Sequence, residues 1–231
     1  MKPIKQLKIW IKIQLKLLAD VYTGHAFTFA GKNTNKFLLL HSIELVQEIK
    51  QTETAAAKLF NIKTAAEKIN PYILLPNEIF SFWKIAGNPN IGFQKSRSIV
   101  NGEILNESGG GICQVAGSIY HVSIIAGLEI LERHNHSIDL YTEETRFAPL
   151  GTDAAVVYGH KDLRIRNCFS FPIKFFFEIT SDRLCIQLLS TEPIHEKKIT
   201  FTIHHNKEKT IVEVCDNNNK KINTSTYKKL I

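Results

Sequence analysis

Apolar residues recur at helical spacing in two stretches of the chain. Within residues 113–130 they lie three or four positions apart, which predicts a helix with one buried face: Val115, Ile119, Val122 and Ala126. The stretch "TETAAAKLFNIKTAAEKIN" is rich in Ala, Lys and Glu and ends at Asn70-Pro71. Because proline cannot continue a helix, we expect a second helix that stops there.

The second half of the chain alternates apolar and polar residues, as half-buried strands do. Two hairpins are predicted, one from "FPIKFFFEIT" and "RLCIQLLS", the other from "KKITFTIHH" and "TIVEVCD". The residues after "NNNK" are expected to form a polar tail. The C-terminal part is therefore predicted to be rich in strands.

Shorter strands are predicted upstream. "NEIFSFW" alternates and carries aromatic residues, "SRSIVNGEIL" predicts a strand pair around Asn101-Gly102, and "TDAAVVYGHKDLRIRN" predicts two short strands joined through Gly159. Residues 20–50 give no clear pattern. Together these elements predict an α+β fold, in which a central helix packs on a mostly antiparallel sheet and a β-rich part comes after it.

The first eighteen residues, "MKPIKQLKIWIKIQLKLL", predict a basic amphipathic helix with apolar residues on one face and lysines beside them. Its lysines interrupt every apolar run, so neither a signal peptide nor a transmembrane segment is predicted. One interpretation is peripheral contact with a membrane through residues 1–18. The other is that the helix packs its apolar face on the protein's own core. A cytoplasmic or peripheral inner-membrane location is expected.

Charge and cysteine content narrow the classes of function. The 231 residues carry a net charge of +7, and the five lysines that precede the first acidic residue account for most of it. The remainder is nearly balanced, so no nucleic-acid-binding surface is expected. The cysteines are widely spaced and form no C-x-x-C motif, so we expect free thiols, and no cofactor is indicated: Cys113, Cys168, Cys185 and Cys215.

The segment "SGGGICQ" holds the strongest candidate for chemistry. Gly109, Gly110 and Gly111 allow a tight turn, and positive φ angles are expected at the last two. Cys113 would then open the helix, where free N–H groups and the helix dipole favour a thiolate. The N–H groups near Cys113 and Gln114 could bind an oxyanion. The alternative is a flexible turn before a small buried hydrophobic residue.

A nucleophilic thiol needs a base, and "ERHNHS" supplies two candidates. His134 and His136 share one face if this segment is a strand, which also suits a metal pair. Such a metal site would need a third ligand, for instance Cys113 or Asp153, and the sequence does not require one. Residues that could orient a base or bind substrate are acidic or basic side chains nearby: Arg133, Asp139, Asp153 and Asp162.

Five segments in this order resemble the VanW-type family over residues 50–190: "EIFSFWKIAG", "GGGICQVAGSIYH", "EILERHNHS", "GTDAAVVYGHKDLRIRN" and "PIKFFFEI". The family is named after glycopeptide-resistance gene clusters, and some longer, exported relatives are L,D-transpeptidases of peptidoglycan that use the motif cysteine. The resemblance implies Cys113 as the nucleophile and His136 as the base. Asp153 or Arg133 would orient the base or hold the substrate.

The residue pattern and the resemblance together divide the chain, and the resemblance implies a class of ligand. Residues 1–48 would be a basic, amphipathic helical region, 49–191 the VanW-like domain, and 192–231 a β-rich extension. A peptidoglycan stem peptide or its precursor would be the partner. Two functions stay open: a cysteine acyltransferase resembling L,D-transpeptidases, and a non-catalytic module that binds peptidoglycan or a glycopeptide.

Overall fold

The computed structural model describes residues 3–33, 35–50, 55–100, 103–139 and 146–229. Its helices are α1 (Pro3–Tyr22), α2 (Ala55–Ile69), α3 (Phe82–Ala86) and α4 (Ile112–Ala126), with a 3-10 turn, η1 (His25–Phe27). The strands of the first half are β1 (His41–Glu48), β2 (Ile79–Ser81), β3 (Lys95–Val100), β4 (Glu103–Ser108) and β5 (Glu129–Glu132). The remaining strands are β6 (Arg164–Arg166), β7 (Ile173–Ile179), β8 (Arg183–Ser190), β9 (Thr200–His205), β10 (Lys209–Cys215) and β11 (Lys221–Lys228).

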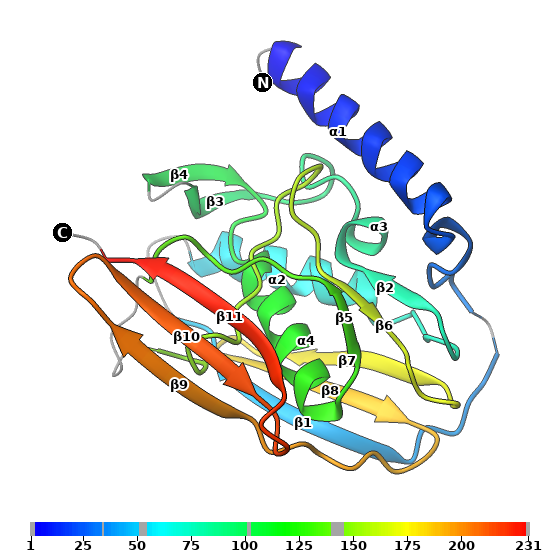
Figure 1. Cartoon of the computed structure of the whole chain (residues 1–231). Coiled ribbons are helices and arrows are strands. Elements are labelled where there is room, and N and C mark those ends of the chain that lie inside the picture. The colour runs from blue at the N-terminus through cyan, green and yellow to red at the C-terminus, as the bar shows by residue number, and fades with distance from the viewer. Residues whose placement is uncertain (1–2, 34, 51–54, 101–102, 140–145, 230–231) are drawn as a thin grey trace.

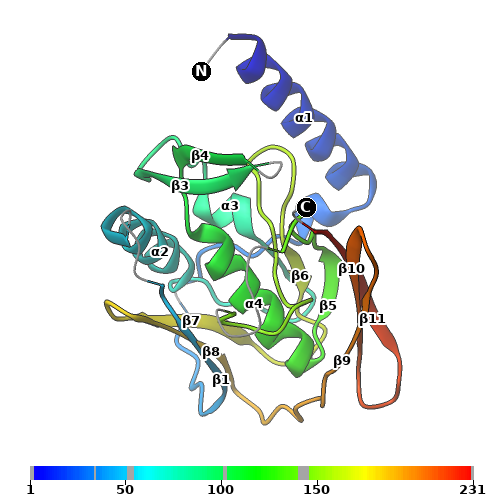
Figure 2. The same cartoon turned by 90° about the vertical axis from the view of Figure 1, so that its left-hand side faces the viewer.

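Helix α4 lies at the centre of the molecule, with strands around it and α2 alongside (Figures 1 and 2). Val115, Ile119 and Val122 on this helix have no exposed surface, as their helical spacing predicts. The helix ends where Gly127 adopts a left-handed conformation, with φ 79°. The central helix and the α+β class are therefore confirmed.

The strands of the described residues form four small antiparallel sheets rather than one large sheet. The sheet β1-β8-β7 packs against α4 through β1 and β8. The sheet β11-β10-β9 lies on another side of α4, and β2-β6-β5 and the hairpin β3-β4 complete the body (Figure 2). Several short sheets bury a helix from several directions, which explains why α4 is apolar on nearly all sides.

The structure confirms both C-terminal hairpins, as β7-β8 and β9-β10, and the strand pair β3-β4. The turn expected at Asn101-Gly102 lies outside the described residues. The predicted helix that stops at Asn70-Pro71 is α2. In "NEIFSFW" only Ile79–Ser81 is a strand, because the Ser81 hydroxyl accepts a hydrogen bond from the Lys84 N–H and caps α3.

Two expectations at the ends of the chain were wrong. Within the region 1–48, expected to be helical, His41–Glu48 forms β1, where Ile43 and Gln47 face inward at strand spacing and pair along β8. The expected polar tail forms β11 instead. Its buried residues, Ser225 and Tyr227, carry hydroxyl groups, so the sequence of the strand looks polar throughout. The division at residues 48 and 191 stays a prediction.

The segment around Gly159 holds less regular structure than expected. Arg164–Arg166 forms β6, but its predicted partner before Gly159 is reduced to a single bridge between Val157 and Lys161. Gly159 has φ 73° and makes the turn between them. This segment passes from Val156, which lies near Cys113, to the turn at Gly159, which lies near Ile9 of α1.

Replacing Phe175 by alanine should destabilise the fold by about 3–5 kcal/mol, because it empties a large site in the core. The Phe175 ring is almost fully buried and meets the Phe80 ring edge-on, with centroids 5.3 Å apart. Urea unfolding measures the change. Leu38→Ala is the control, since Leu38 is 73% exposed and its loss should change stability by less than about 0.5 kcal/mol. Equal effects of the two substitutions would contradict the described core.

Candidate active site

The three glycines before Cys113 form a turn, but only one of the two glycines predicted to have a positive φ angle has one. The positive φ angles fall on Gly109, at 88°, and Gly111, at 98°, and Gly110 does not share them. The expectation for Gly110 was therefore wrong, and that for Gly111 is confirmed. A Cβ on Gly111 would also lie 2.6 Å from Lys58 Cγ. The turn thus brings the chain against α2 just before α4 begins.

A buried asparagine on α2 holds this turn in place. Asn61 has no exposed surface, and its side-chain amide donates to the carbonyl of Gly110 at 3.0 Å. The same side chain bonds both the N–H and the carbonyl of Gln94, at 2.7 and 2.9 Å. The Ser96 hydroxyl gives the Gly110 carbonyl a second hydrogen bond, at 3.0 Å. The sequence carries no signal for this role of Asn61, because nothing in a helix rich in Ala and Lys distinguishes one asparagine as a buried hydrogen-bonding residue.

Cys113 lies in the first turn of α4, as predicted, and is half-buried. Its thiol makes a hydrogen bond with the side chain of His136 and lies 3.9 Å from the carbonyl oxygen of Val156. Burial alone would raise the pKa of the thiol, but the hydrogen bond and charge of His136 outweigh it. The pKa of Cys113 therefore lies below its ordinary value, which favours the thiolate.

His136 bridges the thiol and a carboxylate. Its Nδ1 lies 2.7 Å from Oδ2 of Asp153, and its backbone N–H donates to the same oxygen at 2.7 Å. With Nδ1 on Asp153, the nitrogen left for the Cys113 thiol is Nε2. Burial acts to lower the pKa of His136, but the bonds with Asp153 and Cys113 raise it well above its usual range. The arrangement favours an imidazolium beside a thiolate.

Asp153 accepts hydrogen bonds on both carboxylate oxygens. Oδ2 binds His136, and Oδ1 accepts from Arg133 Nη2 at 2.9 Å and from the Tyr227 hydroxyl. Burial would raise the pKa of Asp153, but His136 and Arg133 lower it to about 2. Because both oxygens accept hydrogen bonds, the carboxylate cannot rotate without breaking a bond. It therefore orients the His136 ring.

Arg133 anchors Asp153 to the C-terminal sheet. Its Nε and Nη2 bond the carbonyls of Asp153 and Gly151, at 2.8 and 3.1 Å, and its Nη1 donates to the Ser225 hydroxyl at 2.6 Å. The guanidinium also stacks over the Tyr120 ring, 4.9 Å from its centroid. Ser225 and Tyr227 both come from β11, which sequence analysis read as a tail. Only the register of a sheet brings these residues to Asp153, so no local signal could have found them.

The predicted site residue His134 lies apart from the thiol–imidazole contact. The His134 Nε2 lies 3.1 Å from Oε1 of Glu132, so the two histidines do not share a face. The segment 133–136 comes after β5 and is not a strand, which removes the alternation that the prediction assumed. No group of three or more His, Cys, Asp or Glu side chains suited to a metal occurs in the part of the chain that the structure describes.

The side chain of Gln114 connects α4 to β1 and does not bond Cys113 or His136. Its side-chain amide donates to the carbonyl of Glu48 at 2.8 Å. Its backbone N–H donates to the Gly111 carbonyl at 3.0 Å, so this N–H is engaged and is not a free oxyanion donor as expected. Of the groups predicted to stabilise an oxyanion, the backbone N–H of Cys113 and the dipole of α4 are left.

Asp139 and Asp162 also lie outside the thiol–histidine group. Asp139 pairs with Arg146, Oδ2 to Nη2 at 2.7 Å. Asp162 accepts from the Ser81 hydroxyl at 2.6 Å and lies 3.2 Å from Nε of Arg164. Both carboxylates therefore make structural contacts away from Cys113 and His136.

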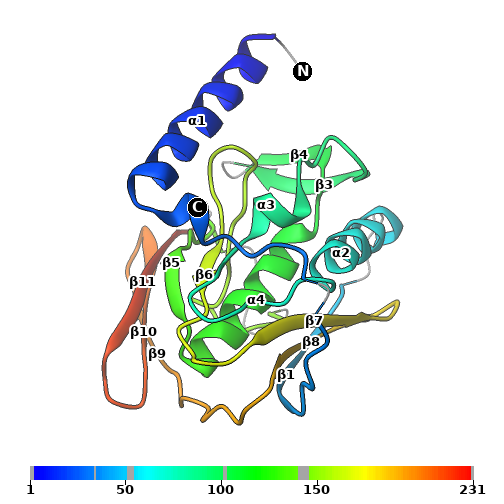
Figure 3. The same cartoon turned by 90° about the vertical axis from the view of Figure 1, so that its right-hand side faces the viewer.

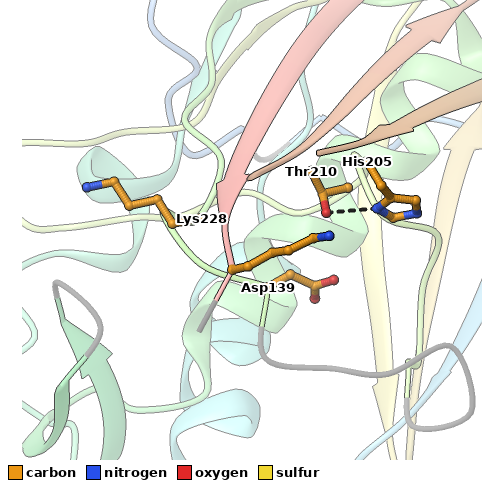
Figure 4. A pocket seen from close by; sticks show the side chains of 5 residues that line it. Asp139, His205, Thr210 and Lys228 are labelled. Atoms are coloured by element: carbon orange, nitrogen blue, oxygen red, sulfur yellow. Dashed lines mark hydrogen bonds between the residues drawn. The ribbon is translucent and has the colours of Figure 1, made fainter. Parts of the chain in front are cut away.

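Two pockets flank the site without containing the thiol. One, of about 520 Å³, is lined by polar side chains (Figure 4): Asp139, His205, Thr210, Lys228 and Lys229. In it, His205 Nδ1 and the Thr210 hydroxyl lie 3.0 Å apart. The other, of about 250 Å³, lies between β5 and β11 and includes Arg133, Tyr120 and Asn223. Cys113 and His136 line neither pocket.

The fold and site define an α+β protein with a cysteine, histidine and aspartate linked at the start of a central helix. A family model described as VanW like protein matches residues 57–189, more than half of the chain. The chain therefore belongs to the VanW-like family. The match includes Cys113, His136 and Asp153 and excludes β11.

Two curated relatives are similar over the same region. The uncharacterized protein YoaR of Bacillus subtilis (strain 168) is 33% identical over 139 residues, which is 59% of this chain and 44% of that protein. The vancomycin B-type resistance protein VanW of Enterococcus faecalis (strain ATCC 700802 / V583) is 31% identical over 135 residues, 58% of this chain and 49% of that protein. The matched region thus spans about half the length of each relative. No solved structure matches the chain.

Gly111→Ala should destabilise the protein by about 1–2 kcal/mol, the usual cost of a left-handed backbone for a residue with a Cβ. Gly31→Ala is the matched control, because a Cβ there meets nothing within 4 Å and its φ is not positive. Thermal unfolding of both variants measures the difference. Equal melting temperatures for the two variants would show that the turn does not require glycine at 111.

Arg133→Lys should cost about 2–4 kcal/mol of stability and slow alkylation of Cys113, because lysine cannot reproduce the fork that holds Asp153. The Arg133 side chain is only 6% exposed. Arg183→Lys is the control, since that side chain is 71% exposed and lies 3.9 Å from Asp182. Urea unfolding and iodoacetamide labelling measure the two effects. If Arg133→Lys matched the control in both, Arg133 would not position the site.

Proposed function

We propose that this protein is a cysteine acyltransferase that acts on peptidoglycan stem peptides, in the manner of an L,D-transpeptidase. The observation that supports it is the hydrogen-bonded series from the Cys113 thiol through His136 to Asp153. A nucleophile, a base in contact with it and a group that orients the base are the components of nucleophilic catalysis. The lowered pKa of Cys113 supports the same chemistry.

The substrate class rests on the family resemblance, in which longer, exported relatives use the motif cysteine on peptidoglycan. In the first half-reaction the Cys113 thiolate attacks the carbonyl carbon between meso-diaminopimelate and D-Ala. The carbonyl electrons move to oxygen, and the dipole of α4 stabilises the resulting oxyanion. The His136 imidazolium then gives its proton to the D-Ala nitrogen, the C–N bond breaks, and D-Ala leaves a thioester on Cys113.

In the second half-reaction an amine of another stem, or water, attacks the thioester carbonyl. Neutral His136 takes the proton of the attacking group, and the C–S bond breaks to release the thiolate. Asp153 keeps the imidazole oriented in both steps, and Arg133 and Tyr227 keep Asp153 in place. Each half-reaction returns one proton to His136 or takes one from it, so the cycle balances.

The alternative is a module that binds peptidoglycan or a glycopeptide without reacting. Binding does not require a thiol of lowered pKa next to an imidazole, whereas catalysis does. The contact between Cys113 and His136 therefore favours the acyltransferase. Thiol reactivity separates the two functions.

Alkylation of Cys113 should extend to lower pH than that of an ordinary thiol, because the pKa of Cys113 is lowered and that of His136 is raised. In His136→Ala both contributions of His136 are lost, so burial and the charge of Asp153 raise the thiol pKa and only the hydrogen bond with the Val156 carbonyl lowers it. That variant should react roughly tenfold or more slowly at pH 7, and the difference should close near pH 10. The rate of iodoacetamide labelling against pH measures this.

His134→Ala is the control for this profile, since the His134 ring lies against Glu132. It should leave the pH profile of Cys113 labelling unchanged. If His134→Ala shifted the profile as much as His136→Ala, the base would not be His136.

Incubation with a tetrapeptide stem should give an adduct whose mass equals the protein plus the stem, less D-Ala. Intact-mass spectrometry detects it, and Cys113→Ala should remove it while circular dichroism stays unchanged. Cys168→Ala is the matched control, because Cys168 is an exposed free thiol and its loss should leave the adduct intact. Stem binding without any adduct would instead identify the protein as a binding module.

A further inference from the structure

Helix α1 is attached to the body along one side. Asp20 is buried and pairs with Arg164, Oδ2 to Nη2 at 3.1 Å, and Lys16 Nζ lies 2.8 Å from Oε1 of Glu132. Ile9 rests on the turn at Gly159, where an added Cβ would lie 2.7 Å from Ile9 Cγ2. Ile13 faces the same turn, with its Cγ1 3.4 Å from that Cβ. The contacts at residues 9, 13, 16 and 20 therefore recur every three to four residues and define a single docked face of the helix.

The opposite side of α1 is apolar and exposed. Eight large apolar residues on it are between 40% and 67% exposed, and at 100° per residue they cover about 160° of the helix: Ile4, Leu7, Trp10, Ile11, Leu15, Leu17, Leu18 and Val21. Figures 1, 2 and 3 show α1 projecting from the body. We define these eight residues as the outer face of α1. The predicted apolar stripe thus does not pack on the core.

Positive charge borders the outer face. Lys8 and Lys12 are exposed and lie beside it on the helix. Asp20, the only acidic residue of α1, is buried in its pair with Arg164. The exposed surface of α1 therefore combines an apolar face and cationic side chains with no exposed acidic group.

We propose that α1 docks its outer face on the surface of an anionic lipid bilayer. A bilayer interface accepts apolar side chains and an indole such as that of Trp10, and its phosphates attract lysines. No helix of the described residues is both long and apolar enough to cross a bilayer, so α1 would lie along the surface. A second copy of α1 fits less well, because it would bring like charges together without an acidic partner.

Co-sedimentation of the full chain with vesicles tests the proposal. Vesicles of phosphatidylcholine with 30% phosphatidylglycerol should bind the protein in low salt, and binding should weaken in 0.5 M salt or on pure phosphatidylcholine. The triple variant Leu7→Gln, Ile11→Gln, Leu18→Gln should lose about 100-fold in affinity, because it removes three apolar side chains from the outer face. The control Leu38→Gln, Leu40→Gln, Ile91→Gln changes side chains that are 69–73% exposed elsewhere, and should bind like the parent.

The lysines are tested separately. Lys8→Gln with Lys12→Gln should weaken binding about 30-fold, or about fivefold for each lysine. Lys63→Gln with Lys207→Gln is the control, since both lysines are exposed on other elements. The proposal is overturned if the parent stays in the supernatant at low salt, or if the outer-face triple variant binds as tightly as its control. It is also overturned if that variant only converts a dimer to a monomer in light scattering, which would identify a second copy as the partner.

Discussion

The carboxylate of Asp153 is the group on which the rest of the site depends. It accepts hydrogen bonds from the backbone and ring of His136, from Arg133 and from Tyr227. These donors come from the segment after β5 and from β11, so one carboxylate joins two separate parts of the fold. A carboxylate this well satisfied stays ionised, and its charge keeps the neighbouring imidazole protonated beside the thiol.

The approach of Asp153 to α4 depends on small side chains in the helix. Gly117 faces residues 152–154, and a Cβ there would meet the Asp153 Cα at 3.6 Å and the Ala154 N at 3.5 Å. These are ordinary contact distances, so a methyl group would fit and a longer side chain would push the segment away. The sequence "QVAGSIY" therefore allows the carboxylate-bearing segment to cross the helix near the turn that carries Cys113. Packing and chemistry are coupled at this crossing.

Local pattern was enough to predict α4, its start near Cys113, α2 and the C-terminal hairpins, since each depends on periodicity within one segment. It was not enough for β1 and β11, whose inward residues are partly polar and are read correctly only beside a partner strand. The roles of Asn61 and Tyr227 could not be predicted for the same reason, because their hydrogen-bond partners are 49 and 74 residues away in the chain. The family resemblance, rather than spacing, singled out His136 from His134.

Strand β11 shows that the region of sequence similarity and the physical unit of the site are different. The family match ends at residue 189, yet Ser225 and Tyr227 complete the hydrogen bonding of Arg133 and Asp153. Cut at the limit of the match, the chain would lose the hydroxyl groups that bond the Arg133 guanidinium and the Asp153 carboxylate. Without β11 these two charged groups would have to be solvated by water instead. The pKa of Cys113 therefore depends, through Asp153 and His136, on a strand that lies far beyond it in the chain.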